Sequence, residues 1–324
     1  MAPRVKPGKG VAVLDRLDLF SVSHLEAILG HSFAELSDLS THAVKYYSPF
    51  VLRAKPHPFV AKAGSTKPRL IDRPFDPLLT IQARIEERIL KTLILPDHLF
   101  GGVRGKSIAD NVRQHLNARY LVTIDIKNFF PSIRPEMINA VWRKFLNCSP
   151  KIAYLLTGLT TYRDRLPQGA PTSTLLANLV LGNNDAEIRA VCKQHAIRYS
   201  SWLDDLAFSG DCAPEMLGSI IAALTKAGFR VSHEKIRLMG PRDRKVLNSL
   251  ILGRFITIKP EYTKGIRAGI YNLGHGRVKD SEVFGRAQSL RGSINFLRLF
   301  DTAKADRLLA QLSAAGERLA TLTD

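Results

Sequence analysis

The chain has 324 residues, and its formal net charge is +18 because 47 lysines and arginines oppose 29 aspartates and glutamates. A chain of this length buries a large core, as one compact unit or as two to three subdomains. So large a basic excess favours polyanionic partners, which are nucleic acid or an anionic membrane surface.

Cysteine usage and hydropathy exclude further classes. The three cysteines, Cys148, Cys192 and Cys212, form no C-x-x-C pair, which disfavours a zinc site and a disulfide framework and favours a reducing compartment. The basic N-terminus lacks the apolar run of a signal peptide. No uncharged stretch reaches the roughly 18 residues that a membrane span needs. The sequence therefore predicts a soluble cytoplasmic protein.

The first third of the chain predicts helices and then a hairpin. After a basic arm, apolar residues in 11–50 recur at helical spacing, which predicts two or three short helices. Residues 46–53 turn extended. Residues 62–74 read as a basic hairpin with a Gly-Ser turn and a final strand stopped by proline. The spacing of Leu78–Leu95 predicts one amphipathic helix.

The rest of the chain alternates strands and helices. An apolar strand from Tyr120 ends at Asp125. The elements expected after it are helices over 135–146, 175–192 and 215–227, strands over 229–232 and within 245–258, and a mostly helical C-terminal subdomain from about 260.

One tempting motif fails. The segment Gly101–Ser107 ends like a phosphate-binding P-loop, but the glycine that the motif needs at position 100 is Phe100. No apolar strand leads into the segment, so the sequence disfavours a P-loop NTPase.

The adjacent carboxylates Asp204 and Asp205 are the most informative feature. Apolar residues flank them on both sides, which predicts two strands joined by a tight turn with the acids at its tip. The Asp-Asp pair alone is also ordinary turn chemistry. Two carboxylates in contact cost energy unless a cation binds them. Together with Asp125 at another strand end, they predict a site for two Mg²⁺ ions, the arrangement used in nucleotidyl transfer.

The order of these elements resembles a known family. Asp125, the segment Leu166–Ser173 (LPQGAPTS) and Asp204-Asp205 follow one another as in a reverse transcriptase, and the resemblance runs from about residue 45 to 275. The segment Gly105–His115 and the short C-terminal part resemble the bacterial retron branch, with no room for an RNase H domain or a maturase extension.

Two departures from the family pattern stand out. The usual Tyr-x-Asp-Asp is here Trp202-Leu203-Asp-Asp, which keeps the aromatic wall but loses its hydroxyl and enlarges the next residue. Leu247–Leu250 replaces the V-T-G element of retron enzymes. The first change bears on template handling and the second on the retron subtype.

The resemblance implies a right-hand polymerase of the α+β class, with a ferredoxin-like antiparallel palm sheet. The implied division is an N-terminal helical extension, fingers, palm and thumb, at residues 1–44, 45–120 with 140–185, 121–139 with 186–255, and 256–324.

The resemblance also assigns roles at the active site. Asp125, Asp204 and the Ile126 carbonyl would ligate two Mg²⁺ ions, with Asp205 beside them as the remaining carboxylate of the metal set. Lys235 would protonate the pyrophosphate.

Other matched positions would bind the dNTP. Lys62 and Arg69 would clamp the triphosphate, or else be solvated hairpin charges. Phe130 would exclude the 2′-hydroxyl of a ribonucleotide, or else be a core aromatic. Gln168 would contact the sugar and phosphate, and Gly169 would allow close backbone approach.

RNA contacts are expected outside this site. Asn111 and His115 stand in the retron-like element, although His115 alternatively caps a helix. The basic and aromatic residues expected to bind RNA in the C-terminal part are Lys264, Arg267, Tyr271, Arg277 and Arg291.

The implied function is RNA-directed DNA synthesis from dNTPs. In the retron branch the template is a structured noncoding RNA, the product is a branched RNA-linked DNA, the role is phage defence, and an effector or toxin protein is a further partner. The alternatives are a diversity-generating or abortive-infection reverse transcriptase, and a non-catalytic RNA-binding module with a polymerase fold.

Overall fold

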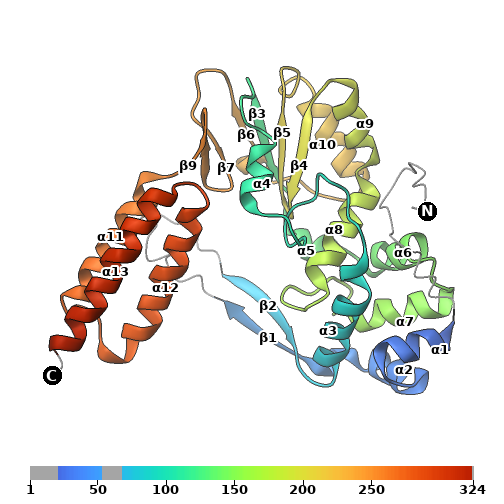
Figure 1. The fold of residues 1–324 in the computed structure, drawn as a ribbon. Helices are drawn as coiled ribbons and strands as arrows, with labels where there is room; N and C mark the ends of the chain where they lie inside the picture. Colours follow the sequence, from blue (N-terminus) through green and yellow to red (C-terminus); the bar gives the residue numbers. More distant parts are fainter. Residues whose placement is uncertain (1–20, 53–67, 323–324) are drawn as a thin grey trace, which may run out of the picture. The chain divides into compact units, whose positions relative to one another are not determined.

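The computed structural model describes residues 21–52 and 68–322, and the chain divides into two compact units (Figure 1). Unit 1 contains the described residues up to Leu52 and those of Leu70–Arg242, and unit 2 contains Pro68, Arg69 and those from Asp243 onward. Each unit has a hydrophobic core of its own.

Local sequence signals fix the ends of several helices in unit 1. Ser32 and Glu35 form a reciprocal capping box at the start of α2, and Ser107 and Asp110 do so at the start of α4. Pro135 occupies the first turn of α6, where its missing N–H costs nothing. The α-helices of unit 1 are α1 (Val22–Leu29), α2 (Phe33–Thr41), α3 (Leu78–Arg88), α4 (Ile108–Arg113), α5 (Phe129–Ser132), α6 (Pro135–Phe145), α7 (Pro150–Thr160), α8 (Ser173–Asn184), α9 (Ala186–Gln194) and α10 (Leu217–Lys226).

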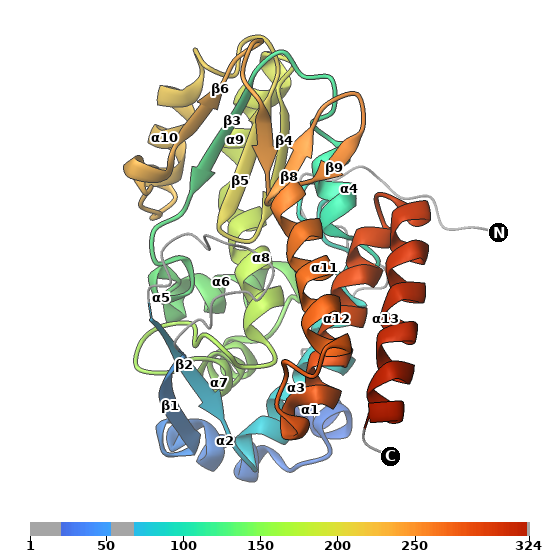
Figure 2. The same cartoon turned by 90° about the vertical axis from the view of Figure 1, so that its left-hand side faces the viewer.

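A four-stranded antiparallel sheet is the centre of unit 1, and Figure 2 shows its strands side by side. The order is β4 (Arg198–Trp202), β5 (Asp205–Ser209), β3 (Leu121–Asp125) and β6 (Arg237–Met239). Apolar side chains of β3 and β5, such as Val122 and Phe208, are fully buried in the core that also takes in α9 and α10. This burial fixes the register, because a slip by one residue would expose that face.

Unit 1 also contains a two-stranded ribbon, formed by β1 (Tyr47–Leu52) and β2 (Arg69–Pro74), apart from Arg69 at the start of β2. Three short 3₁₀ helices link its elements: η1 (Ala43–Tyr46), η2 (Leu90–Thr92) and η3 (His233–Lys235).

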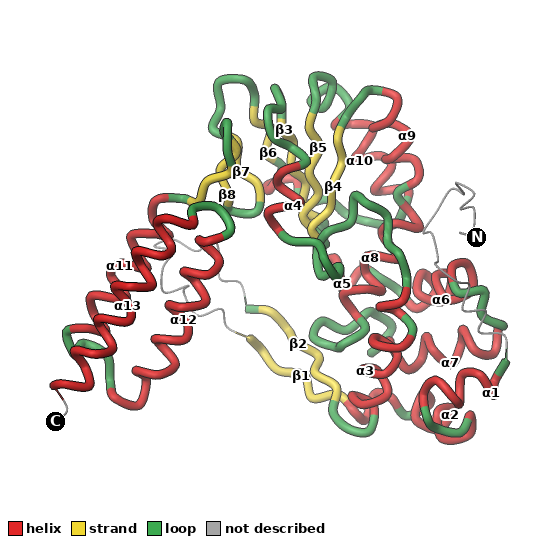
Figure 3. The backbone as a smooth tube through the Cα atoms, viewed as in Figure 1, coloured by secondary structure: helices red, strands yellow, loops and turns green. Residues whose placement is uncertain are grey.

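Unit 2 joins a small sheet to three long helices, which Figure 3 shows in red. Its strands are β7 (Lys245–Leu247), β8 (Leu250–Leu252) and β9 (Ile256–Ile258), paired antiparallel in that order. Its helices are α11 (Pro260–Gly274), α12 (Asp280–Arg298) and α13 (Thr302–Leu322), which share the apolar core of the unit.

Three expected elements differ from the structure. The helix predicted over Leu78–Leu95 ends at Arg88 and continues as η2. The helix predicted over 175–192 is two helices that meet at the buried Asp185, whose carboxylate binds Arg189 and His98. The strand predicted over 229–232 is reduced to one bridge, between Val231 and Ile126.

Candidate active site

Three aspartates meet at one end of the central sheet. Asp125 is the last residue of β3 and faces Asp205, the first residue of β5, in the antiparallel register. Asp204 belongs to the two-residue turn between β4 and β5, and its carbonyl accepts a hydrogen bond from the Ile126 amide at 2.9 Å. The sheet therefore brings together the three acids that the sequence picked out.

The Asp125 carboxylate is engaged by two side chains that come from one segment of the chain. Lys235 donates to both carboxylate oxygens, at 2.8 and 2.9 Å. Ser232 donates to the Asp125 carboxylate from its hydroxyl at 2.8 Å and to the Asp125 carbonyl from its amide at 2.9 Å. The sequence identified Lys235 but not Ser232. Ser232 reaches Asp125 because its neighbour Val231 forms a bridge with Ile126, a contact between distant segments that the sequence does not encode locally.

The carboxylates of the site repel one another. Burial, and then the neighbouring charges of Asp204 and Asp125, raise the pKa of Asp205 to about 6. The hydrogen bond to Asp125 raises the pKa of Lys235, so its ammonium stays charged. Crowded carboxylates of this kind are stabilised by a cation, and Lys235 supplies one here.

The donor set suits a hard divalent cation. Within residues 21–52 and 68–322, no three His, Cys, Asp or Glu side chains already form a cluster that could hold a metal ion. Both oxygens of Asp125 face Lys235 in this arrangement. The residues nevertheless fit Mg²⁺, because carboxylate and carbonyl oxygens are its usual ligands. Burial, and then the charges of Asp204 and Asp125, raise the pKa of Asp205, and a cation bound there would relieve that repulsion. To hold the metal, Asp125 would release at least one of its hydrogen bonds from Lys235.

The Gln168–Gly169 turn is tied to the ribbon. The Gln168 carbonyl accepts from the Asp72 amide at 2.8 Å. Gly169 has a φ of +115°, and an added Cβ would lie 2.7 Å from Ile71, so glycine is required both by conformation and by space. Asp72 is buried and binds Arg165 through both oxygens, at 3.2 and 3.0 Å. This ion pair carries no signal in the sequence.

The remaining substrate-binding candidates are Arg69, Lys62 and Phe130. Arg69 is the exposed first residue of β2, and Lys62 lies outside the described residues. Phe130 is partly buried in α5 and meets the Phe129 ring edge-on, with ring centroids 5.8 Å apart. Both expectations for Phe130, a sugar contact and a core aromatic, are compatible with that partial burial.

The sequence predicted that Asn111 and His115 contact RNA, but the structure does not expose them. Both side chains are fully buried. The His115 ring nitrogens lie 2.7 Å from the hydroxyls of Ser209 on β5 and Ser200 on β4. His115, two residues after α4, therefore links this segment to the central sheet. Its ring is fully buried and bonded to two serines, so it neither faces RNA nor caps a helix.

The RNA-binding candidates of unit 2 are all on its surface. Lys264, Arg267, Tyr271, Arg277 and Arg291 are exposed on α11, just after it, or on α12. The Tyr271 ring stacks on His275 at 3.9 Å between centroids, and the Arg277 guanidinium lies 5.2 Å from the Tyr271 ring centre. His275 was missed in the sequence, although its i+4 spacing from Tyr271 is a usable signal.

Hydropathy adds one observation. None of the helices in the part of the chain that the structure describes has both the length and the apolar character to cross a membrane.

The chain is similar to known reverse transcriptases. The profile of the family "Reverse transcriptase (RNA-dependent DNA polymerase)" matches residues 60–253. The retron Ec86 reverse transcriptase of Escherichia coli is 28% identical over 259 residues, which cover 78% of this chain and 79% of that protein. The retron Se72 reverse transcriptase of Salmonella heidelberg is 31% identical over 152 residues, 47% of this chain and 40% of that protein.

Two further similarities span most of the chain. The retron Mx65 reverse transcriptase of Myxococcus xanthus is 24% identical and covers 90% of this chain and 70% of its own. Among solved structures, apo telomerase from Candida tropicalis has a TM-score of 0.46 at 11% identity, covering 90% of this chain and 63% of that one. The chain thus spans less than two thirds of the telomerase.

The family match agrees with the fold. It covers β2 to β8, including the antiparallel sheet with its three aspartates and the Gln168–Gly169 turn. The expected polymerase fold of mixed helices and antiparallel sheets is confirmed. So is the expectation of an enzyme, which sets aside the non-catalytic RNA-binding module. The chain belongs to the reverse transcriptase family of RNA-dependent DNA polymerases and is of the retron type, as its curated relatives are.

Proposed function

We propose that the chain polymerises DNA at the Asp125, Asp204 and Asp205 site by a two-metal mechanism. The observation that carries the proposal is the register that sets Asp125 opposite Asp205 while the Asp204 carbonyl is bonded to the Ile126 amide. Asp125, Asp204 and the Ile126 carbonyl would hold two Mg²⁺ ions, with Asp205 as the adjacent carboxylate. When bound, the ions activate the primer 3′-hydroxyl and stabilise the leaving pyrophosphate.

The chain's own groups supply binding and proton transfer. Lys235 is charged and exposed at the site, so it can donate a proton to the departing pyrophosphate once Asp125 has released it. Gln168 contacts the sugar and phosphate of the dNTP, and Arg69 with Lys62 binds its triphosphate. Phe130 excludes the 2′-hydroxyl.

The assignment of subdomains follows the same proposal. We assign residues 45–120 and 140–185 to the fingers, 121–139 and 186–255 to the palm, and 256–324 to the thumb. Residues 1–44 form an N-terminal extension whose described part contains α1 and α2.

The template is proposed to be a structured noncoding RNA, as in a retron. The relatives named above support this, together with the exposed cations and aromatic ring of unit 2, because folded RNA is recognised by phosphate contacts and by stacking on unpaired bases. Priming from a 2′-hydroxyl of that RNA would give a branched RNA–DNA product. A role in phage defence, an effector protein partner and a cytoplasmic location complete the proposal.

The test is to isolate nucleic acid from cells that carry the native locus and to treat it with a debranching enzyme. We expect an RNA-linked DNA whose mobility changes on debranching and which is absent from cells carrying Asp204→Asn. A DNA product that debranching leaves unchanged, or that needs an external primer, would contradict retron chemistry. That result would favour a diversity-generating or abortive-infection enzyme.

A further inference from the structure

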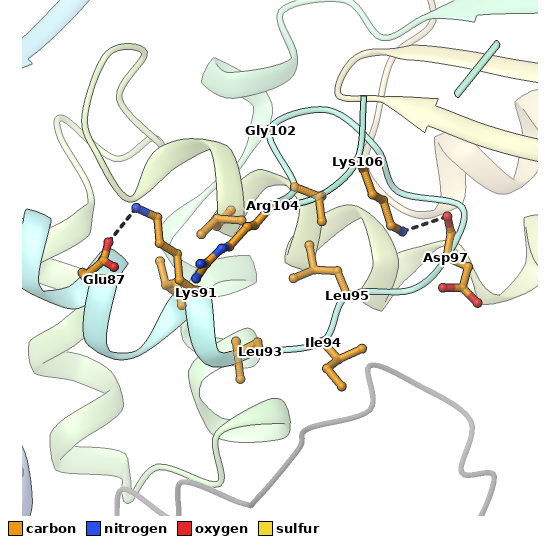
Figure 4. A pocket seen from close by; sticks show the side chains of 12 residues that line it. Glu87, Lys91, Leu93, Ile94, Leu95, Asp97, Gly102, Arg104 and Lys106 are labelled. Atoms are coloured by element: carbon orange, nitrogen blue, oxygen red, sulfur yellow. Dashed lines mark hydrogen bonds and ion pairs between the residues drawn. The ribbon is translucent and has the colours of Figure 1, made fainter. Parts of the chain in front are cut away.

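The loop of residues 93–107, which leads from η2 into α4, is closed by a single ammonium group (Figure 4). Lys106 donates hydrogen bonds to the carbonyls of Pro96, Asp97 and Leu99, at 3.1, 2.9 and 2.9 Å. Three acceptors on one cation hold the backbone of the loop in a fixed course. We call this segment the brace loop.

The brace loop runs beside β4, the strand that leads into the turn of Asp204. The Ser201 amide donates to the His98 carbonyl at 2.8 Å, and the Phe100 amide donates to the Ser201 carbonyl at 2.9 Å. Leu99 and Ser201 form a parallel bridge. The imidazole of His98 is anchored on the buried Asp185. The brace loop is therefore hydrogen-bonded to β4 on both sides of Leu99.

Gly101 meets the turn itself. A Cβ added to Gly101 would lie 2.8 Å from both the backbone nitrogen and the Cγ of Leu203, and 3.1 Å from the carbonyl carbon of Trp202. Two of these atoms belong to the backbone, so rotating a side chain cannot relieve the clash. The side-chain amide of the buried Asn178 donates to the Gly101 carbonyl at 2.8 Å, which holds Gly101 against the turn.

The turn has an unusual backbone that requires such support. Leu203 has a φ of +58°, a region that residues with a bulky side chain rarely adopt. The Ser201 hydroxyl donates to the Leu203 carbonyl at 2.8 Å, and the Ile126 amide donates to the Asp204 carbonyl at 2.9 Å. The turn is thus held by β4 with the brace loop and by the end of β3.

We propose that Gly101, Asn178 and Lys106 are positioning residues for catalysis. They fix the backbone of Leu203 and thereby set where Asp204 presents its carboxylate. The inference rests on the proposed function, because it takes Asp204 to be a catalytic residue. A displacement of about 1 Å at a reacting group can cost about 100-fold in rate, so a fit of this kind affects turnover.

The test uses the full chain with Gly101→Ala and Asn178→Leu as variants. Gly218→Ala is the matched control, because nothing lies within 4 Å of a Cβ added there. We expect kcat for extension of an artificial primer on an RNA template to fall about 10- to 100-fold in both variants. The KM for dNTP and the affinity for RNA should stay near those of the parent, while the thermal midpoint should fall in both variants, because one carries a backbone clash and the other loses a buried hydrogen bond. Hydrogen exchange of the Ile126 and Ser201 amides should become faster, and the control should change in neither assay.

A Gly101→Ala protein with the parent's kcat and exchange rates would overturn the proposal. If that variant does not fold, Lys106→Met replaces it, since it loosens the brace loop without touching the turn. It must then show the same faster exchange at Ser201, and unchanged exchange overturns the proposal. Asp204→Asn separates the two ideas: full synthesis by that variant would refute the metal site, while the exchange data would still decide on the brace loop.

Discussion

The buried His115 makes the stability of unit 1 depend on pH in a calculable way. Burial, and then the charge of Arg198, lower the pKa of His115 from 6.5 to about 3. Its ring bridges the hydroxyls of Ser200 and Ser209 and is therefore neutral throughout the physiological range. In the unfolded chain the same ring titrates near its ordinary value.

The sign follows from proton binding. Between pH 6.5 and about 3, the unfolded state binds a proton that the folded state excludes, so the free energy of unfolding rises with pH. The contribution is fully present above pH 6.5 and is lost as the pH falls toward 3. One pH unit corresponds to about 1.36 kcal/mol, so the loss between pH 6.5 and pH 5 is about 2 kcal/mol.

The assay is denaturant unfolding at pH 7, 6 and 5, followed by tryptophan fluorescence, because both tryptophans, Trp142 and Trp202, lie in unit 1. His115→Gln should be less stable than the parent at pH 7. Between pH 7 and pH 5, the free energy of unfolding should fall by about 2 kcal/mol more in the parent than in His115→Gln. The control is His24→Gln, the same change at an exposed position. Equal losses in His115→Gln and in the parent would refute the assignment of a neutral, buried imidazole.

Three further predictions concern the substrate, the RNA and the ribbon. Phe130→Ala should admit ribonucleotides while keeping dNTP use, and unchanged discrimination in single-nucleotide extension would leave Phe130 as core packing alone. Charge reversal of Lys264 and Arg267 should abolish priming on the cognate RNA and spare extension of an artificial primer–template; equal loss on both substrates would count against specific recognition. Arg165→Met should cost about 3–5 kcal/mol in the free energy of unfolding, because it leaves the buried Asp72 carboxylate unpaired, and a loss below about 1 kcal/mol would contradict that.

The sequence predicted the elements that local patterns encode. The hairpin that carries Asp204 and Asp205, the strand that ends at Asp125 and the helical C-terminal part were all found where expected. Alternation of apolar residues, proline stops and turn residues act over a few positions, so one sequence suffices to detect them.

The contacts that join distant segments could not be predicted in this way. Ser232 on Asp125, Arg165 on Asp72 and Gly101 against Leu203 each depend on where two separate elements meet. His115 shows the same limit, because nothing in its local sequence distinguishes an exposed histidine from one that bonds two serines on neighbouring strands. These contacts are properties of packing, which periodicity does not report.

The most direct test of the account is primer extension on an RNA template by Asp204→Asn, Asp205→Asn and the double variant. Asp211→Asn, at an exposed position beyond β5, is the matched control. The change removes charge at nearly constant volume, so we expect the fold and RNA binding to remain. DNA synthesis should disappear in each single variant and in the double variant, and the control should retain full activity. Extension at the parental rate by the double variant would contradict the assignment of these carboxylates to the metal site.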